Sequence, residues 1–248
     1  MISDLLTVRY DKYMGTSLIA WQYSRLSDKR KSNKKLFIKA IKSDFKVMGT
    51  APPSIKDDKN MIKYAIKICS TAFYHASDRL KNNFNFVKTV SVDKPWIIQY
   101  ASYRLKDSDL LMSHILKKSG TCLRFASKRI INNELLVLLA MRNNYHSLKY
   151  ASESLKDNDK FVLNAITIHG NALQYVSERI QNIEKYALLS LKHSNHESWV
   201  NIKSQIKDKY LYLADVYNIS LTNLINQLID EQKIYKFNCK VDIHFFYQ

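Results

Sequence analysis

The chain has 248 residues, of which 46% are apolar and 12% aromatic, and this content of core-forming side chains excludes a disordered protein. Four glycines and three prolines supply too few special turns for a β-sandwich or β-barrel, so the composition favours helices. The formal net charge is +17: residues 1–120 hold 23 Lys and Arg against 10 Asp and Glu, and residues 121–248 hold 16 against 12. Such a basic half attracts nucleic acid, anionic lipid or an acidic protein, unless it reflects only an overall bias towards lysine, asparagine and isoleucine.

The cysteines and the N-terminal sequence indicate the cellular compartment in which the protein is expected. Cys69, Cys122 and Cys239 lie far apart and are odd in number, so we expect reduced thiols rather than a disulfide framework or a zinc site. The first 15 residues lack the apolar core of a signal peptide, and no window approaches 18 apolar residues. We therefore expect a cytoplasmic protein, in its own cell or in a host, without a classical signal peptide or a transmembrane segment.

Several columns of residues recur every 25 positions along the chain. One column is serine, at Ser77, Ser102, Ser127, Ser152 and Ser177. A second is Ile55, Leu80, Leu105, Ile130, Leu155 and Ile180, and alanine or valine precedes each serine. Independent columns in one register indicate an array of structural repeats.

Each repeat is predicted to hold two short helices. Leu148, Ala151 and Leu155 have the i, i+3, i+7 spacing of one helix face. A polar column then predicts the N-cap of the second helix, because short side-chain oxygens accept hydrogen bonds from the first backbone N–H groups of a helix. That column is Ser32, Asp57, Asn82, Asp107, Asn132, Asp157 and Asn182.

The second helix of each repeat is predicted to be amphipathic. Its first apolar column is Phe37, Ile62, Val87, Met112, Val137, Val162 and Ala187. Four residues later the column Ile41, Ile66, Leu116, Met141, Ile166 and Leu191 follows, interrupted only by Ser91. Gly120 and Gly170 stand where these helices should end and are predicted C-cap residues.

These patterns predict an all-α fold, an α-solenoid of about seven 25-residue two-helix repeats that stack to bury their apolar faces. We expect one continuous solenoid domain: residues 1–47 form an N-terminal cap and a degenerate first repeat, 48–197 the regular helical repeats, and 198–248 a C-terminal cap. Pro52 and Pro53 predict a short or distorted first helix in their repeat. Residues 220–231 predict a capping helix, and alternating apolar residues from Tyr235 to Phe245 predict a strand-like tail.

Two stretches carry a family resemblance. The sequences LKYASESLKDNDKFVLNAITIHG, residues 148–170, and NALQYVSERI, residues 171–180, resemble the repeat of the domain of unknown function 4116 family. The match is close from Tyr145 to Glu178 and looser from about Ser70. The resemblance implies a helical-repeat fold in proteins of host-associated intracellular bacteria and large DNA viruses, and hence an effector or viral protein. It brings no catalytic residues, so no functional site is carried over.

Two basic columns are candidate binding sites. The first helices carry Arg79, Arg104, Arg129 and Arg179, with Ser154 as the gap, and such a row could pair with successive phosphates or carboxylates. The alternative is that each arginine pairs with a neighbouring acid, Asp78, Glu153 or Glu178, on a solvated face.

The second basic column lies towards the ends of the second helices, at Lys42, Lys67, Lys117, Arg142 and Lys192, and Lys39, Lys63 and Lys88 join it in early repeats. Compensation of the helix dipole would explain the last-turn members but not these three mid-helix lysines. We therefore expect a basic concave face, confined to the N-terminal half, as the binding surface.

The remaining motifs give no sign of catalysis. Tyr100, Phe125, Tyr150 and Tyr175 form an aromatic column that could stack on bases, although packing between repeats in the core is the preferred interpretation. His193 and His196 lack a third metal ligand, and no nucleotide-binding or hydrolase motif occurs. We expect no cofactor, no metal and no enzymatic activity. The predicted function is a non-catalytic scaffold that binds an acidic protein or peptide; the alternatives are nucleic-acid binding through phosphates and, remotely, an enzyme.

Overall fold

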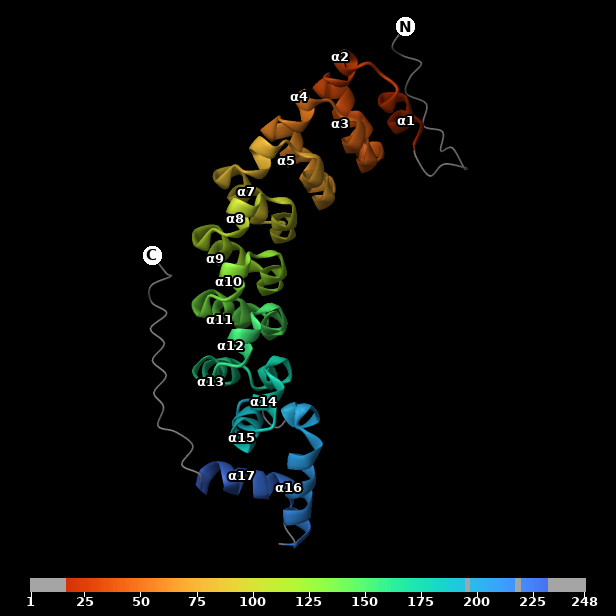
Figure 1. The fold of residues 1–248 in the computed structure, drawn as a ribbon. Coiled ribbons are helices and arrows are strands. Elements are labelled where there is room, and N and C mark those ends of the chain that lie inside the picture. Colours follow the sequence, from red (N-terminus) through yellow and green to blue (C-terminus); the bar gives the residue numbers. More distant parts are fainter. Residues whose placement is uncertain (1–16, 195–196, 217–219, 232–248) are drawn as a thin grey trace. The chain divides into compact units, whose positions relative to one another are not determined.

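A computed structural model describes residues 17–194, 197–216 and 220–231, and these residues are mostly helical, with no β-strand among them (Figure 1). The predicted strand-like tail lies outside the described residues. Contacts divide the chain into a first unit that ends at Ser127 and a second unit that begins at Lys128. Each unit is described by itself.

Both units repeat the same three elements: a one-turn α-helix, a longer α-helix and a 3-10 helix. In the first unit, after α1 (Leu18–Ser24), the one-turn helices are α2 (Asp28–Lys31), α4 (Pro53–Lys56), α6 (Asp78–Lys81) and α8 (Tyr103–Lys106). The long helices are α3 (Lys34–Ser43), α5 (Lys59–Ile68), α7 (Phe84–Ser91) and α9 (Asp109–Lys118). The 3-10 helices are η2 (Phe45–Thr50), η3 (Ser70–His75), η4 (Pro95–Tyr100) and η5 (Gly120–Phe125).

The second unit continues the pattern and then departs from it. Its one-turn helices are α10 (Lys128–Ile131), α12 (Glu153–Lys156) and α14 (Glu178–Gln181), and its long helices are α11 (Glu134–Asn143), α13 (Asp159–Ile168) and α15 (Glu184–Lys192). Its 3-10 helices are η6 (Tyr145–Tyr150), η7 (Gly170–Tyr175) and η8 (Glu197–Asn201). Two helices without repeat periodicity follow, α16 (Ser204–Val216) and α17 (Leu221–Glu231).

The prediction of a single first helix in each repeat is wrong. Leu148 lies in η6 and Leu155 in α12, and the backbone between them is extended at Ala151 and Ser152. The break occurs because the Leu155 N–H donates to the Ser152 hydroxyl at 3.2 Å, so that a new helix begins at this serine. The serine column therefore consists largely of N-caps of one-turn helices.

The predicted N-caps of the long helices are displaced by one residue. Asp157 ends α12, whereas Asn158 caps α13 by accepting a hydrogen bond from the Phe161 N–H at 2.9 Å. The residues that cap long helices in this way are Asn33, Asp58, Asn83, Ser108, Asn133 and Asn158. The predicted column instead closes the preceding one-turn helix, which leaves its side chains free for other partners.

The two glycines are not C-caps, which is a further correction. Gly120 and Gly170 begin the 3-10 helices η5 and η7. A Cβ at Gly170 would clash with the carbonyl oxygen of Ser190 in α15 and lie 2.8 Å from the Ser194 Cβ. Glycine is required there for the close approach of the following repeat rather than for ending a helix. Likewise, Pro53 occupies the first position of α4 without making it shorter than α6 or α8.

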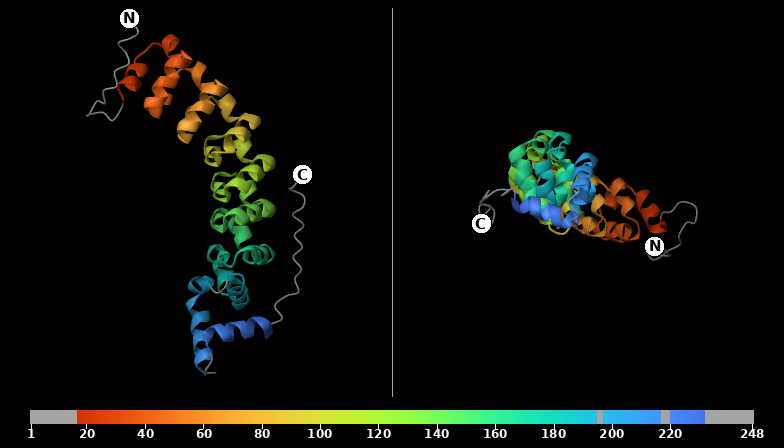
Figure 2. Two further views of the ribbon diagram at one scale, coloured as in Figure 1. Left: turned by 180° about the vertical axis from the view of Figure 1, so that it is seen from behind. Right: turned by 90° about the horizontal axis from the view of Figure 1, so that it is seen from below.

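The apolar columns form the core, as predicted. Both columns of the long helices are buried, including the interrupting Ser91, and so is the column that includes Leu80 and Ile180. Full burial of an aliphatic or aromatic side chain stabilises the fold by about 1.5–3 kcal/mol. Within the first unit each long helix contacts the next one, from α3 to α9, and within the second unit the same holds from α11 to α15 (Figure 2).

The helix predicted at residues 220–231 is present as α17. Its N-terminus is capped by the Ser220 hydroxyl, which accepts from the Asn223 N–H at 3.2 Å. Leu224, Ile225 and Ile229 are buried, and α17 contacts both α16 and α15. This helix therefore covers the last long helix of the second unit.

Candidate functional site

The two basic columns lie on different elements. Arg79, Arg104, Arg129 and Arg179 belong to the one-turn helices, whereas the lysines of the second column belong to the long helices. Arg142 and Lys192 belong to the second unit, whereas Lys42, Lys67 and Lys117 belong to the first. The two columns therefore differ in the kind of helix that carries them.

The arginines are bound within the protein. Arg79 Nε donates to both carboxylate oxygens of Asp57, at 2.9 and 3.0 Å, and its Nη2 donates to the Asp57 carbonyl oxygen at 2.8 Å. Arg179 binds Asp157 similarly, with Nε to Oδ1 at 2.9 Å and Nη2 to the carbonyl oxygen at 2.6 Å, and its Nη2 also donates to Asp159 Oδ2 at 3.0 Å. The partner is the residue that closes the one-turn helix of the preceding repeat. Arg79 and Arg179 thus pair with acids, as in the alternative interpretation, but with Asp57 and Asp157 rather than with Asp78 and Glu178.

The serine column completes this contact between repeats. Ser77 and Ser177 donate their hydroxyl protons to Asp57 and Asp157, and Ser102 donates to Asn82 Oδ1 at 2.7 Å. The backbone N–H of each serine also donates to a carbonyl of the preceding repeat, for example Ser77 to Lys56 at 2.9 Å. We call this arrangement of Asp or Asn, Ser and Arg, spaced 20 and 22 residues apart, the clasp.

The clasp changes the ionisation of its carboxyl groups. Hydrogen bonds from Arg79 and then Ser77 lower the pKa of Asp57 below its ordinary 3.8. Hydrogen bonds from Ser177 and Arg179 lower the pKa of Asp157 in the same way. These acids are ionised at neutral pH, so the clasp arginines that face them are neutralised.

The sequence contains a signal for the clasp that its periodicity alone did not expose. Arginine follows 22 residues after each aspartate of the column, at Arg79, Arg129 and Arg179, whereas serine follows Asn132, at Ser154. Ser154 donates to Asn132 Oδ1 at 2.7 Å, so a neutral pair replaces the charged one. The 22-residue spacing between the aspartates and the arginines is therefore a sequence signal for pairing between repeats.

Five lysines of the first unit are different, because they have no partner within the described residues. We define the lysine face as Lys39, Lys42, Lys63, Lys67 and Lys88. All five are exposed, and within the described residues none makes a hydrogen bond or an ion pair. Lys117 also lies on α9 in the same unit, but it has a partner. The lysine face therefore carries positive charge that the protein itself does not neutralise.

The long helices of the two units differ in charge. The sequences of α3, α5 and α7 contain lysines and no acidic residue, and α9 contains one, Asp109. In the second unit, each of α11, α13 and α15 begins with an acid, Glu134, Asp159 or Glu184. The basic bias of the sequence is thus concentrated on the long helices of the first unit.

The pKa of His114 indicates the sign of the electrostatic potential beside Lys88, at one end of the lysine face. Burial lowers its pKa below the ordinary 6.5, and the charges of Lys88, Lys118 and Lys117 lower it further. These lysines belong to two successive repeats, so cations from α7 and α9 act on the same imidazole. The local potential therefore favours anions.

The 3-10 helices present aromatic rings beside cations. The prediction that the aromatic column is core is wrong, because Tyr100 is only half-buried and its neighbour Tyr74 is 61% exposed. Tyr74 meets Tyr100 edge-on with 5.8 Å between ring centroids, and Lys81 Nζ lies 5.5 Å from the Tyr74 centroid. The rings do contact one another between repeats, as expected, but on a surface that solvent reaches.

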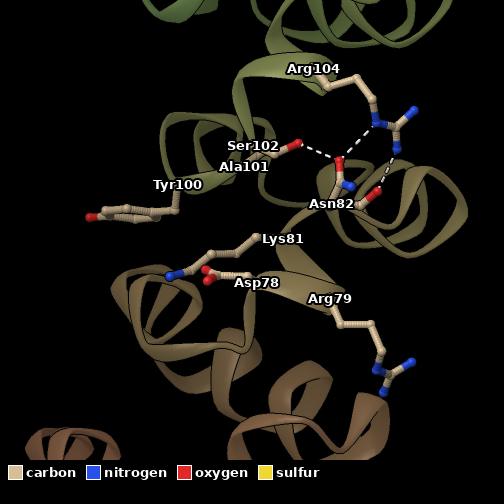
Figure 3. Close-up of a pocket in the computed structure, with 8 residues that line it drawn as sticks. All are labelled: Asp78, Arg79, Lys81, Asn82, Tyr100, Ala101, Ser102 and Arg104. Atoms are coloured by element: carbon tan, nitrogen blue, oxygen red, sulfur yellow. Dashed lines mark hydrogen bonds between the residues drawn. The ribbon is translucent and has the colours of Figure 1, made fainter.

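A hollow of about 710 Å³ separates α6 from α8 (Figure 3). Its lining includes Lys81 and Tyr100 on one side and Asn82, Ser102 and Arg104 on the other. Lys81 and Asn82 belong to one repeat and Ser102 and Arg104 to the next, and the clasp between Asn82 and Arg104 forms part of the wall. The hollow is lined by more basic than acidic side chains.

Metal-ligating side chains do not gather in the described ranges, where no group of three or more His, Cys, Asp or Glu residues could hold an ion. His196 lies outside these ranges, so the pair with His193 is not described. Cys69 and Cys122 are free thiols. No helix of the described part of the chain is long and apolar enough to cross a bilayer.

Two segments of the chain match a known protein family. Residues 58–90 and 133–181 match the family model described as Domain of unknown function (DUF4116). The resemblance is confirmed. Both DUF4116 segments begin at the residue that caps a long helix, Asp58 or Asn133, and together they include the clasp members Arg79 and Asp157. No curated protein and no solved structure matches the chain.

Proposed function

We propose that this protein is a non-catalytic interaction module that binds an acidic protein or peptide through the lysine face. In this proposal about seven repeats stack as one α-solenoid, in which every repeat contacts only its neighbours. The recurrence of the clasp and of the buried columns within each unit supports the stacking. The protein contributes the positively charged lysine face, and the partner contributes negative charge.

The observation that carries the proposal is the contrast between the two basic columns. The arginines are held in the clasp, whereas the five lysines of the lysine face have no partner among the described residues. Unpaired cations on neighbouring helices repel one another, which destabilises the isolated fold. An acidic partner removes this repulsion and is attracted by the summed field.

The test is charge reversal with a matched control. Lys39, Lys63, Lys67 and Lys88 are replaced by Glu, and in the control Lys29, Lys46, Lys94 and Lys128, which are exposed but lie outside the long helices, are replaced by Glu. Binding of a labelled oligoglutamate peptide is measured by fluorescence anisotropy. The lysine-face variant should lose binding, while the control, with the same net charge, retains most of it. Equal losses in both variants would contradict the proposal.

Nucleic-acid binding is the second candidate, and the aromatic rings favour it. Exposed Tyr74 beside Lys81 resembles the combination of ring and cation on which unpaired bases stack. Pull-downs from lysate with and without nuclease separate the candidates. Nuclease-sensitive recovery, with affinity that falls steeply as salt rises, would support nucleic acid over an acidic protein.

A further inference from the structure

The charges of the clasp are matched in four other pairs of residues spaced 22 apart. Asp57 faces Arg79 and Asp157 faces Arg179, so two charged groups meet. Asn132 faces Ser154 at 2.7 Å, and Ser32 faces Ser54 at 2.8 Å, so two neutral groups meet. Where the clasp holds an arginine in these pairs, at least one carboxylate balances its charge, and Arg179 also meets Asp159 at 3.0 Å.

One pair breaks this rule. Arg104 Nε donates to Asn82 Oδ1 at 2.9 Å, and Arg104 Nη2 donates to the Asn82 carbonyl oxygen at 2.7 Å (Figure 3). The geometry is that of Arg79 on Asp57, but the acceptor is an amide and carries no charge. Arg104 is exposed and makes no ion pair with a described residue. Its positive charge is therefore not compensated by the protein.

Donor groups around this charge are also unused. Arg104 Nη1 and Asn82 Nδ2 have no hydrogen-bond partner within the described residues. The outer edge of a guanidinium presents parallel N–H groups that match two oxygens of an oxyanion. Asn82, which bonds Nε and Nη2 of Arg104, adds an unused amide donor beside the guanidinium, and both residues line the hollow between α6 and α8.

The geometry points to a phosphate-binding site formed by Arg104 and Asn82. A phosphate has three or more oxygens, so it can accept hydrogen bonds from Nη1 and Nη2 of Arg104 and from Nδ2 of Asn82 together. A carboxylate offers only two oxygens. The phosphate takes the place of the carboxylate that Asp57 and Asp157 supply in the matched pairs. This site lies on the one-turn helices and is independent of the lysine face.

The recurrence of the clasp allows one substitution that should remove phosphate binding and another that should create it. Asn82→Asp gives Arg104 an internal carboxylate, so it should abolish phosphate binding while making the clasp stronger. Asp57→Asn converts the neighbouring pair into a copy of Asn82 and Arg104, so it should create phosphate binding at Arg79. Asn82 is exposed and Asp57 is half-buried. Both changes keep side-chain size, and thermal unfolding verifies that each variant is folded.

The measurement follows the arginine Nε–H signals by NMR during titration with inorganic phosphate, phenyl phosphate and dimethyl phosphate. The Arg104 signal should shift saturably in the natural protein, and the affinity should fall by at least about tenfold in Asn82→Asp. In Asp57→Asn the Arg79 signal should shift as well. Preference for phenyl over dimethyl phosphate would identify a monoester as the ligand, and the reverse a diester.

Three outcomes would overturn the assignment. The Arg104 signal could stay unshifted at all phosphate concentrations. It could shift equally in the natural protein and in Asn82→Asp. It could shift no more than the signals of Arg25 and Arg30, two exposed arginines outside the clasp, which would show only general attraction to a basic protein.

Discussion

At the scale of single residues, the Ser177 hydroxyl serves two repeats at once. It accepts from the Ile180 N–H at 3.4 Å as the N-cap of α14, and it donates to Asp157 in the clasp. Ser177→Ala should therefore lower the free energy of unfolding by about 1 kcal/mol or more, the usual cost of losing a cap. Urea unfolding measures the change.

Ser113→Ala is the control for this serine. Ser113 Oγ donates only to the Leu110 carbonyl of its own helix, at 3.0 Å. Its removal should change the free energy of unfolding by less than about 0.5 kcal/mol. Equal effects of the two substitutions would show that the clasp adds nothing to stability.

The clasp carboxyl groups should make stability depend on acid pH. The pKa of Asp57 and of Asp157 lies below the ordinary 3.8, so the folded state binds protons less readily than the unfolded state. Their contribution is complete above the ordinary value and is lost as pH falls through the folded pKa. The urea midpoint should decline below about pH 4, and this decline should be shallower in the double variant Asp57→Asn, Asp157→Asn. Parallel declines would contradict the pairing.

At the scale of elements, η7 and α15 meet so closely that Gly170 has no room for a side chain. Gly170→Ala places a Cβ against backbone of α15, and relieving such overpacking costs about 1–3 kcal/mol. Gly49→Ala is the matched control, because its Cβ would lie 3.7 Å from the His75 side chain, an ordinary contact. Thermal unfolding should show a clear loss for the first variant and little change for the second.

The long helices were predictable from the sequence because their apolar columns have helical spacing and follow a cap residue. The position of that cap was not, because cap-type residues occupy two adjacent columns, as in Asp57–Asp58 and Asn82–Asn83. Either residue could begin a helix by its chemistry alone. Only the contact 22 residues later shows that the first is taken by the clasp.

The 3-10 helices were not predictable from spacing. Leu148, Ala151 and Leu155 suit one continuous helix as well as two short ones, since both place these residues on one side. The exposure of the aromatic column was mispredicted for the same reason, because the positions of these rings depend on where the helix breaks. The five residues of the lysine face belong to the basic column that the sequence singles out, and their role in binding remains a prediction.

At the scale of the whole molecule, the contacts within each unit join elements that are close in the sequence. In the second unit α13 contacts α11 and α15, and η7 contacts η6 and η8. Stability in such an array is a sum over repeats and their nearest neighbours. A local defect should therefore spread only as far as neighbouring repeats.

Hydrogen exchange can measure this spread in Gly170→Ala. Exchange should accelerate most in η7 and α15, less in α11, and not at all in α5 of the first unit. Uniform acceleration throughout the chain would show that the molecule unfolds as one cooperative body instead.

The alternation of charged and neutral acceptors in the clasp restricts how the chain can grow by duplication. A duplicated segment 58–82 would set the copy of Arg79 against Asn82 and leave it without a counter-charge. A duplicated segment 58–107 would set the same copy against Asp107 and keep an acid opposite it. Lengthening by two periods thus preserves the electrostatic match at the new join, although it also copies the pair of Asn82 and Arg104 inside the segment. Lengthening by one period places an arginine opposite an uncharged asparagine at the join itself.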